Sequence, residues 1–278
     1  MSDRSVSFDR AAEYYDRTRV TDPQALQESL DLLERELGGR GRVLEIGVGT
    51  GALAVPLAER GLDLVGLDLS TAMLAQLRRK STSVPVVAGD ATRLPFANAS
   101  FGGAYARWVL HLIPSWREAV DEFVRVVGPG GVVVVEPGGY RGDWLDVWQR
   151  IEEELGPAVR HIGLDVQGGG AGQLDAAFAQ HGAKPREQVT IVEGQANDTL
   201  ARFFDDARHR SFSWTWRVDQ ASLARGLDAV EAWARERYGD DLTAVESQMQ
   251  MAWRLYDLPI VGGPSAAPGD VRYPRRRP

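Results

Sequence analysis

The 278-residue sequence contains no cysteine, so disulfide bonds, thiolate metal ligands and cysteine nucleophiles are all excluded. It has only four histidines, and they lie too far apart to share a metal ion on one helix. We therefore expect no metal site.

Long apolar runs and an excess of positive charge are also missing. No stretch reaches the ~18 apolar residues of a membrane-spanning helix, and the N-terminus lacks the apolar core of a signal peptide. The formal net charge of −7 disfavours a polyanionic partner such as DNA or RNA. A short basic run at 275–277 is flanked by prolines, and we interpret it as a frayed tail. We expect a cytoplasmic protein without a nucleic-acid partner, and a homodimer is compatible with the sequence.

Strand and helix patterns alternate along the first half of the chain. Leucines at helical spacing predict a helix within 1–40, and helices are also expected at 71–80 and 115–127. The predicted strands lie at 42–46, 62–67, 84–88, 103–107 and 132–135. Four consecutive valines in the last of these are typical of a strand buried on both faces of a parallel sheet. The alternation predicts a doubly wound α/β fold with right-handed crossovers.

The second half of the chain is less regular. Residues 143–181 and the aromatic-rich 197–238 look helical, and strands fit 188–192 and 245–255, the latter with one solvated face. About 50 residues separate these strands, whereas a hairpin loop usually has a few. Because this insertion leaves from the ligand-binding edge of the sheet, we expect 197–238, with 140–181, to form part of a substrate lid. The alternative is that its aromatic side chains pack only against the sheet.

The most informative segment is 43–51, Val-Leu-Glu-Ile-Gly-Val-Gly-Thr-Gly. An apolar strand enters a loop that contains Gly47, Gly49 and Gly51, and a helical pattern follows. Such a loop lets the backbone approach a nucleotide-like ligand closely. Asp68, about 20 residues on, ends the next strand, where a carboxylate can accept both ribose hydroxyls. Taken alone, these features fit either NAD or another adenosine ligand.

Two further acids and a missing motif separate those alternatives. Asp90 follows the strand at 84–88 and is expected close to an adenine. Glu45 lies near the end of the first strand, where it can balance a positively charged amino-acid group but would repel a pyrophosphate. The Tyr-x-x-x-Lys pair of short-chain dehydrogenases is absent, since glutamine stands four residues before both Lys80 and Lys184.

This constellation resembles the class I S-adenosylmethionine-dependent methyltransferases. The matching segments, in family order over residues 40–140, are 43–51, 66–70, 89–91, 108–111 and 128–131. The segment 8–16, Phe-Asp-Arg-Ala-Ala-Glu-Tyr-Tyr-Asp, looks like the lead-in of the branch that contains ubiquinone and menaquinone C-methyltransferases. The family often has an acid at the opening of the fourth strand, where this chain has Phe101, Gly102 and Gly103.

The resemblance implies S-adenosylmethionine as cofactor, a small-molecule acceptor methylated on oxygen, nitrogen or carbon, and a Rossmann-like sheet. That sheet would have seven mostly parallel strands, the last of them antiparallel. The expected organisation is an N-terminal helical segment covering the cofactor (1–40), a cofactor-binding core (41–139), the rest of the sheet with a helical lid (140–258) and an irregular tail (259–278). The expected cofactor-binding residues are Glu45, Gly47, Gly49, Gly51, Asp68, Leu69, Met73, Asp90, Ala91, Ala106 and Tyr15.

Methyl transfer from a sulfonium is an in-line displacement with an activated donor, so alignment is the main contribution expected of the protein. Where the acceptor must lose a proton, His111 is the candidate base, because it follows the fourth strand at the ligand-binding edge. The alternative is a histidine packed at the start of a helix. Arg107 is a candidate partner for an acidic substrate, or for the acids around it. Two other functions stay open: a non-catalytic cofactor-binding or assembly protein on the same fold, and an NAD-dependent oxidoreductase.

Overall fold

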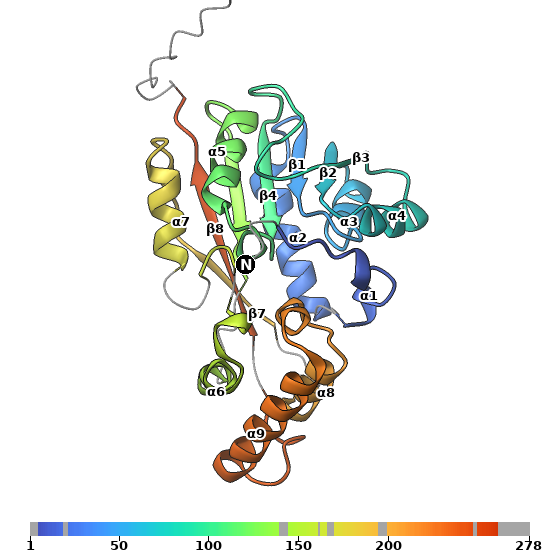
Figure 1. Ribbon diagram of the computed structural model, residues 1–278. Coiled ribbons are helices and arrows are strands. Elements are labelled where there is room, and N and C mark those ends of the chain that lie inside the picture. The colour runs from blue at the N-terminus through green and yellow to red at the C-terminus, as the bar shows by residue number, and fades with distance from the viewer. Residues whose placement is uncertain are drawn as a thin grey trace, which may run out of the picture.

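The structure is a computed structural model that describes residues 5–18, 22–138, 144–160, 162–165, 170–193, 199–246 and 249–260. A single sheet runs through it in the order β3-β2-β1-β4-β5-β8-β6, with β7 also paired to β8 (Figure 1). The strands are β1 (Val43–Ile46), β2 (Leu64–Asp68), β3 (Val86–Ala88), β4 (Gly103–Arg107), β5 (Val132–Glu136), β6 (Lys184–Pro185), β7 (Val189–Glu193) and β8 (Met249–Asp257). The first five are parallel, as the sequence predicts.

Helices cover both faces of this sheet (Figure 1). The helices over one face are α2 (Pro23–Leu37), α3 (Ala54–Glu59) and α4 (Thr71–Lys80), and over the other face α5 (Trp116–Val127) and α7 (Gly170–Ala179). Alternate valines of β5 enter the two cores, Val132 and Val134 on one side and Val133 and Val135 on the other. A strand covered on both faces needs apolar residues at every position, which explains the four-valine run.

Three short helices lie in the first half of the chain: η1 (Asp9–Ala11), α1 (Tyr15–Thr18) and η2 (Leu110–Leu112). Capping side chains define where two of the longer helices begin. The Asp22 carboxylate accepts a hydrogen bond from the Ala25 amide at the start of α2, and the Ser70 hydroxyl accepts one from the Met73 amide at the start of α4. The expected helix at 71–80 therefore has the bounds of α4. No helix in the described part of the chain is both long and apolar enough to cross a membrane.

The sixth strand of the predicted seven is divided into β6 and β7. Both pieces pair with β8, and β8 is antiparallel to β5, so the predicted antiparallel last strand is confirmed. The prediction that the 245–255 strand has one solvated face is wrong for the C-terminal half of that strand. Helix α7 covers that face: the Phe178 ring stacks on Tyr256 with centroids 4.0 Å apart, and Asp175 is ion-paired with Arg254. Of the polar residues that suggested exposure, Arg254 is therefore satisfied by the helix rather than by water, Gln250 is exposed, and Gln248 lies outside the described residues.

The insertion between β7 and β8 consists of α8 (Leu200–Arg208), η4 (Ser213–Arg217) and α9 (Gln220–Tyr238). It packs against α6 (Leu145–Leu155) and η3 (Gly156–Val159), and this group lies beyond the end of the sheet in Figure 1. Phe203, Phe204 and Trp214 are buried in a cluster whose described members all come from outside the strands. The alternative in which these aromatic side chains pack only against the sheet is therefore wrong. Of the predicted tail, only residues 259 and 260 lie within the described residues.

Candidate functional site

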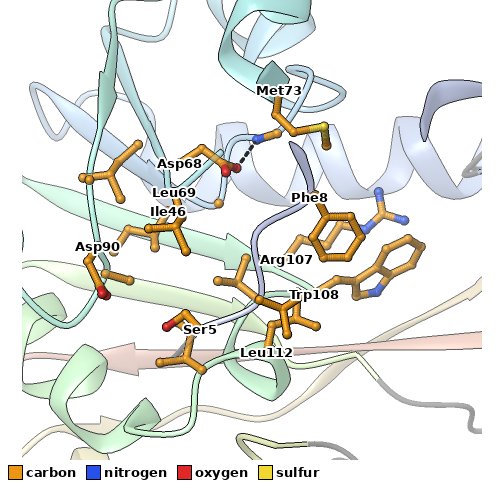
Figure 2. A pocket seen from close by; sticks show the side chains of 18 of the residues that line it. Ser5, Phe8, Ile46, Asp68, Leu69, Met73, Asp90, Arg107, Trp108 and Leu112 are labelled. Atoms are coloured by element: carbon orange, nitrogen blue, oxygen red, sulfur yellow. Dashed lines mark hydrogen bonds between the residues drawn. The ribbon is translucent and has the colours of Figure 1, made fainter. Parts of the chain in front are cut away.

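A pocket opens at the carboxyl ends of β1, β2 and β4 (Figure 2). Its volume is about 90 Å³, small beside the roughly 300–1,000 Å³ of typical small-molecule sites. Part of the space is taken by residues 5–8, which cross the opening in Figure 2. The residues that line the pocket are Ser5, Val6, Phe8, Tyr15, Ile46, Gly47, Gly49, Leu67, Asp68, Leu69, Met73, Gly89, Asp90, Ala91, Arg107, Trp108, Val109, Leu112 and Ile113.

The glycine loop forms one wall of this pocket. Gly47 has a φ of +74°, and a Cβ there would lie 2.1 Å from Cγ2 of Val109, so both its conformation and its surroundings require glycine. The loop is tied to β2, because the Gly47 amide donates to the Leu67 carbonyl at 2.7 Å. Gly49 also lines the pocket, whereas Gly51 packs against Leu77 instead.

Asp68 connects the loop to the end of β2. Its two carboxylate oxygens accept hydrogen bonds from the Gly49 and Ser70 amides, both at 2.8 Å. Burial raises the pKa of Asp68 despite these bonds. Next to it on the pocket wall, Asp90 accepts bonds from the Thr92 amide and hydroxyl, both at 2.9 Å, which fixes the turn after β3. Two acids from neighbouring strands thus face one cavity.

Glu45 lies inside the protein rather than on the pocket wall. Only 4% of it is exposed, and its Oε2 accepts a hydrogen bond of 2.7 Å from the Tyr105 hydroxyl. Loss of hydration is the main reason that its pKa rises to about 8, with a further upward contribution from the charge of Asp68. The Tyr105 bond and the positive charge of Arg107 act in the opposite direction. Because this pKa lies near neutral pH, a charged group that enters nearby can change the protonation state of Glu45.

The N-terminal segment is fastened across the site. Asp9 accepts hydrogen bonds from the Ser70 hydroxyl at 2.6 Å and the Ala72 amide at 3.2 Å, and these bonds lower its pKa. Asp16 accepts one from the Thr50 hydroxyl and pairs with Lys80, both at 2.5 Å. Tyr15, which lines the pocket, lies between these two anchors in the sequence.

Neither His111 nor Ala106 is among the residues that line the pocket. Ala106 is 1% exposed within β4. The Nδ1 of His111 is 3.3 Å from the Pro137 carbonyl oxygen, and the imidazole packs beside Gly138. This placement is the one expected for a histidine packed at a helix start, and its role as a base stays a prediction. In the described residues, no group of three or more histidines and acids could hold a metal ion.

Several pocket residues were not among the expected cofactor-binding residues. Phe8 makes edge contacts with Tyr15, at 5.7 Å between ring centroids, and with Trp216 of the insertion, at 5.0 Å. The Arg107 guanidinium lies over the ring of Trp108, 4.1 Å from its centroid. Residues 108–111 are one of the segments that match the family, and this match could have indicated that part of the pocket wall. Nothing local in the sequence predicts the approach of Phe8 to Trp216.

Comparison with known proteins matches residues 44–135 to a family model described as a methyltransferase domain. A demethylmenaquinone methyltransferase from Paenarthrobacter aurescens is 36% identical over 205 residues, which cover 72% of each chain. The chain belongs to the class I S-adenosylmethionine-dependent methyltransferases.

The match covers different shares of other methyltransferases in this family. A malonyl-[acyl-carrier protein] O-methyltransferase from Enterobacter lignolyticus is 31% identical over 78% of this chain and 90% of its own length. A demethylmenaquinone methyltransferase from Beutenbergia cavernae is 38% identical over 46% of this chain, and the match spans about half of that relative, 55%. The resemblance is therefore shared by relatives with unlike acceptors.

Solved structures show the methyltransferase fold at lower identity. A putative methyltransferase from Bacillus halodurans superposes with a TM-score of 0.60 at 19% identity, covering 84% of this chain and 99% of its own. The [4+2]-cyclase SpnF superposes with a TM-score of 0.55, also at 19% identity, covering 93% and 99%. A fold that is shared with a protein described as a cyclase does not by itself define the reaction, so the reaction must be inferred from the residues of the site.

Proposed function

We propose that this methyltransferase-family chain uses S-adenosylmethionine to methylate a small-molecule acceptor. The observation that carries the proposal is the order of groups along the carboxyl edge of the sheet. Asp90 follows β3, Asp68 ends β2, and the Gly47 loop follows β1, all lining one pocket. Adenine, ribose and methionine of an extended cofactor would meet these three groups in that order, as the family resemblance implies.

The residues present fit this cofactor. Asp68 would accept the ribose hydroxyls, Leu69 and Met73 would flank the adenine, and Asp90 with Ala91 would meet the adenine edge. The positive φ of Gly47 leaves backbone without a side chain at the methionine part. The buried Glu45 would balance the amino group of the methionine through the loop or a water molecule, and Gly51 and Ala106 would support the wall from behind.

When bound, the cofactor supplies a methyl group on a positively charged sulfur. The contribution of the protein is to align the acceptor with that methyl group and to exclude water, and alignment alone can contribute about 7–11 kcal/mol. Tyr15 and the segment 5–8 would close over the cofactor, and because the segment fills part of the small cavity it must shift to admit it. His111 is retained as the base for an acceptor that must lose a proton.

The insertion and α6 are proposed as the lid over the acceptor. Their separate aromatic core makes them a packed unit of their own, and Trp216 joins that unit to the N-terminal segment through Phe8. This arrangement supports a binding space enclosed between the sheet edge, the N-terminal segment and the lid. A cytoplasmic location and a homodimer stay predictions from the sequence.

Calorimetric titration with S-adenosylmethionine, S-adenosylhomocysteine and NAD tests the proposal. We expect micromolar binding of the first two and none of NAD. Tight NAD binding would favour the oxidoreductase alternative and overturn the proposal. Cofactor binding without methyl transfer to any member of a panel of small aromatic, isoprenoid and carboxylic acceptors would favour the non-catalytic alternative.

A further inference from the structure

Two tryptophans of the proposed lid keep a buried N–H group without a partner. Trp144, which precedes α6, is 6% exposed, and Trp214 in η4 is 5% exposed. The indole nitrogens of both are buried and find no hydrogen-bond acceptor among the residues that the structure describes. A buried tryptophan N–H usually has such a partner, and leaving it unpaired costs free energy. Each unpaired group of this kind needs an explanation, and one aromatic cluster contains two of them.

Neighbouring aromatic residues show that packing does not require these donors. The Trp148 indole donates to Glu152 at 3.2 Å, and the Trp216 indole donates to the Arg210 carbonyl at 2.7 Å. At Phe203 the same cluster is filled by a ring that has no donor at all. The N–H groups of Trp144 and Trp214 therefore indicate a partner from outside the chain. Ligand sites commonly combine apolar and aromatic walls with a few polar groups of this kind.

The rings beside one of these donors suit a flat molecule. The rings of Phe212 and Trp214 are parallel within 9°, with centroids 6.0 Å apart. The parallel rings of Phe178 and Tyr256 in the sheet are only 4.0 Å apart. The two lid rings therefore cover each other less completely, and Phe212 is only partly buried. A flat aromatic molecule that meets these faces gains contact area beside the N–H group.

Both donors belong to segments that adjoin the pocket. Trp214 shares η4 with Trp216, and the ring of Trp216 meets the pocket residue Phe8 at 5.0 Å between centroids. Trp144 follows β5, which pairs with β4 at the edge of the sheet where the pocket opens. A molecule bound between the pocket and the lid can therefore meet both segments.

The chemistry of the donors defines the class of molecule. An indole N–H only donates, so its partner must be an acceptor atom. The arginines of α6 and α8 are already ion-paired with acids: Arg150, Arg202 and Arg208. An anion among neutral donors and aromatic rings would lose more hydration than it regains. We propose that Trp144 and Trp214 donate hydrogen bonds to neutral carbonyl oxygens of a flat apolar acceptor and so select it over molecules without those oxygens. The inference deepens the proposed function and rests on it.

The probes are aryl ketones and alkenes of the same shape: acetophenone with α-methylstyrene, and 2-acetylnaphthalene with 2-isopropenylnaphthalene. Calorimetry on the full chain, with and without saturating S-adenosylhomocysteine, gives the ratio of ketone to alkene affinity. Replacing both Trp144 and Trp214 by phenylalanine should lower this ratio about tenfold, because a hydrogen bond in an apolar site carries roughly that preference. An unchanged ratio in the folded double variant would overturn the inference. Failure of both ketones to bind the parent would overturn it as well.

Two control variants separate the hydrogen bond from packing. Trp148→Phe makes the same change of ring size in the same cluster, but the N–H group that it removes already has a partner in Glu152. Trp253→Phe removes a buried N–H that also lacks an acceptor in the described part of the chain, but Trp253 belongs to the sheet core. Both controls should keep the parent ratio within about threefold. A tenfold fall in Trp148→Phe would assign the effect to packing and overturn the inference.

Nuclear magnetic resonance observes the two donors directly. The chain has eight tryptophans, so their indole N–H signals can be assigned with the phenylalanine variants. We expect the signal of Trp144, of Trp214 or of both to move downfield when a ketone binds and not when its alkene binds. If neither signal moves, the partner is not the ketone oxygen and the inference is wrong. Failure of the parent to bind S-adenosylhomocysteine would instead count against the proposed function, and the same spectra without it still test the two donors.

Discussion

Tyr105 donates a 2.7 Å hydrogen bond to Glu45 from the position directly opposite it on the neighbouring parallel strand. Both side chains are buried, and burial raises the pKa of Glu45 to about 8 although the bond favours the charged form. A raised pKa favours the protonated carboxyl group in the folded protein at neutral pH. It stands two residues before Gly47, so its protonation is coupled to the part of the fold where the cofactor is proposed to bind.

Protein stability should depend on pH through Glu45. Between its ordinary pKa of 4.5 and the folded value of about 8, the unfolded chain has lost the proton that the folded protein keeps. The free energy of unfolding therefore falls as pH rises through this range, by at most about 1.4 kcal/mol per pH unit from this group. Asp68, whose pKa is also raised, acts in the same direction above its ordinary value of 3.8.

Urea unfolding at pH 5, 6.5 and 8 measures this dependence. Glu45→Gln keeps an acceptor for Tyr105 but cannot ionise, so its stability should fall less steeply and exceed that of the parent at pH 8. Glu59→Gln makes the same chemical change at an exposed position and should leave the slope unchanged. Equal slopes for the parent and Glu45→Gln would show that Glu45 is not the group responsible.

Binding of S-adenosylmethionine should release a proton near pH 7. The positively charged amino group of the cofactor favours the ionised form of Glu45, so binding would lower its pKa and expel the proton to the buffer. Calorimetry in phosphate and in Tris, which differ in ionisation enthalpy, should give different apparent binding enthalpies for the parent. Glu45→Gln should give nearly the same value in both buffers. A parent enthalpy that is independent of the buffer would contradict the proposed contact.

The sequence predicts the fold well because the parallel core is encoded locally. Each strand of this core carries its own apolar run, and capping residues such as Ser70 define helix starts without reference to the rest of the chain. The division of the sixth strand and the covering of β8 by α7 depend on contacts between distant segments. Arg254 reads as a solvated residue in the sequence, yet it is ion-paired with Asp175, 79 positions away.

The candidate site could be predicted only in part for a similar reason. Gly47 and Gly51 belong to one motif, but the first faces the pocket and the second packs on Leu77. The spacing of glycines does not encode that difference. Phe8 enters the pocket because the Val6 amide bonds to the Leu112 carbonyl at 3.1 Å, a contact between segments that have no sequence pattern in common.

Gly47→Ala tests the steric requirement of the glycine loop. The added methyl group would lie 2.1 Å from Cγ2 of Val109 in addition to meeting an unfavourable φ of +74°. Gly39→Ala is the matched control, because Gly39 has a φ of +73° but nothing within 4 Å of the added carbon. We expect the control to lose about 1 kcal/mol of stability and Gly47→Ala to lose about 2–4 kcal/mol.

Binding should distinguish the two glycine variants more clearly than stability does. Gly47→Ala should abolish detectable cofactor binding, while Gly39→Ala should bind as the parent does. Calorimetry at a temperature well below both melting transitions makes the comparison independent of unfolding. Full affinity in a folded Gly47→Ala protein would contradict the placement of the cofactor against this loop.

Trp216→Ala tests whether the insertion works as a lid. Trp216 is only partly buried, its indole N–H donates to the Arg210 carbonyl at 2.7 Å, and its ring meets Phe8 and Arg10 of the N-terminal segment. Its loss should therefore weaken the contact between the lid and the segment that covers the pocket while leaving the core of the lid intact. Any binding space enclosed by these two parts should open.

The expected result is a loss of about tenfold in affinity for whichever member of the acceptor panel binds the parent, with less than about threefold change for S-adenosylhomocysteine. Trp233→Ala removes the same side chain elsewhere in the insertion and should leave both affinities unchanged. Trp214→Ala, in contrast, removes a buried ring and should lower stability by about 3–5 kcal/mol. Parent-like acceptor affinity in Trp216→Ala would mean that the acceptor binds without the insertion, because the contact between Trp216 and Phe8 joins the lid to the segment that covers the pocket.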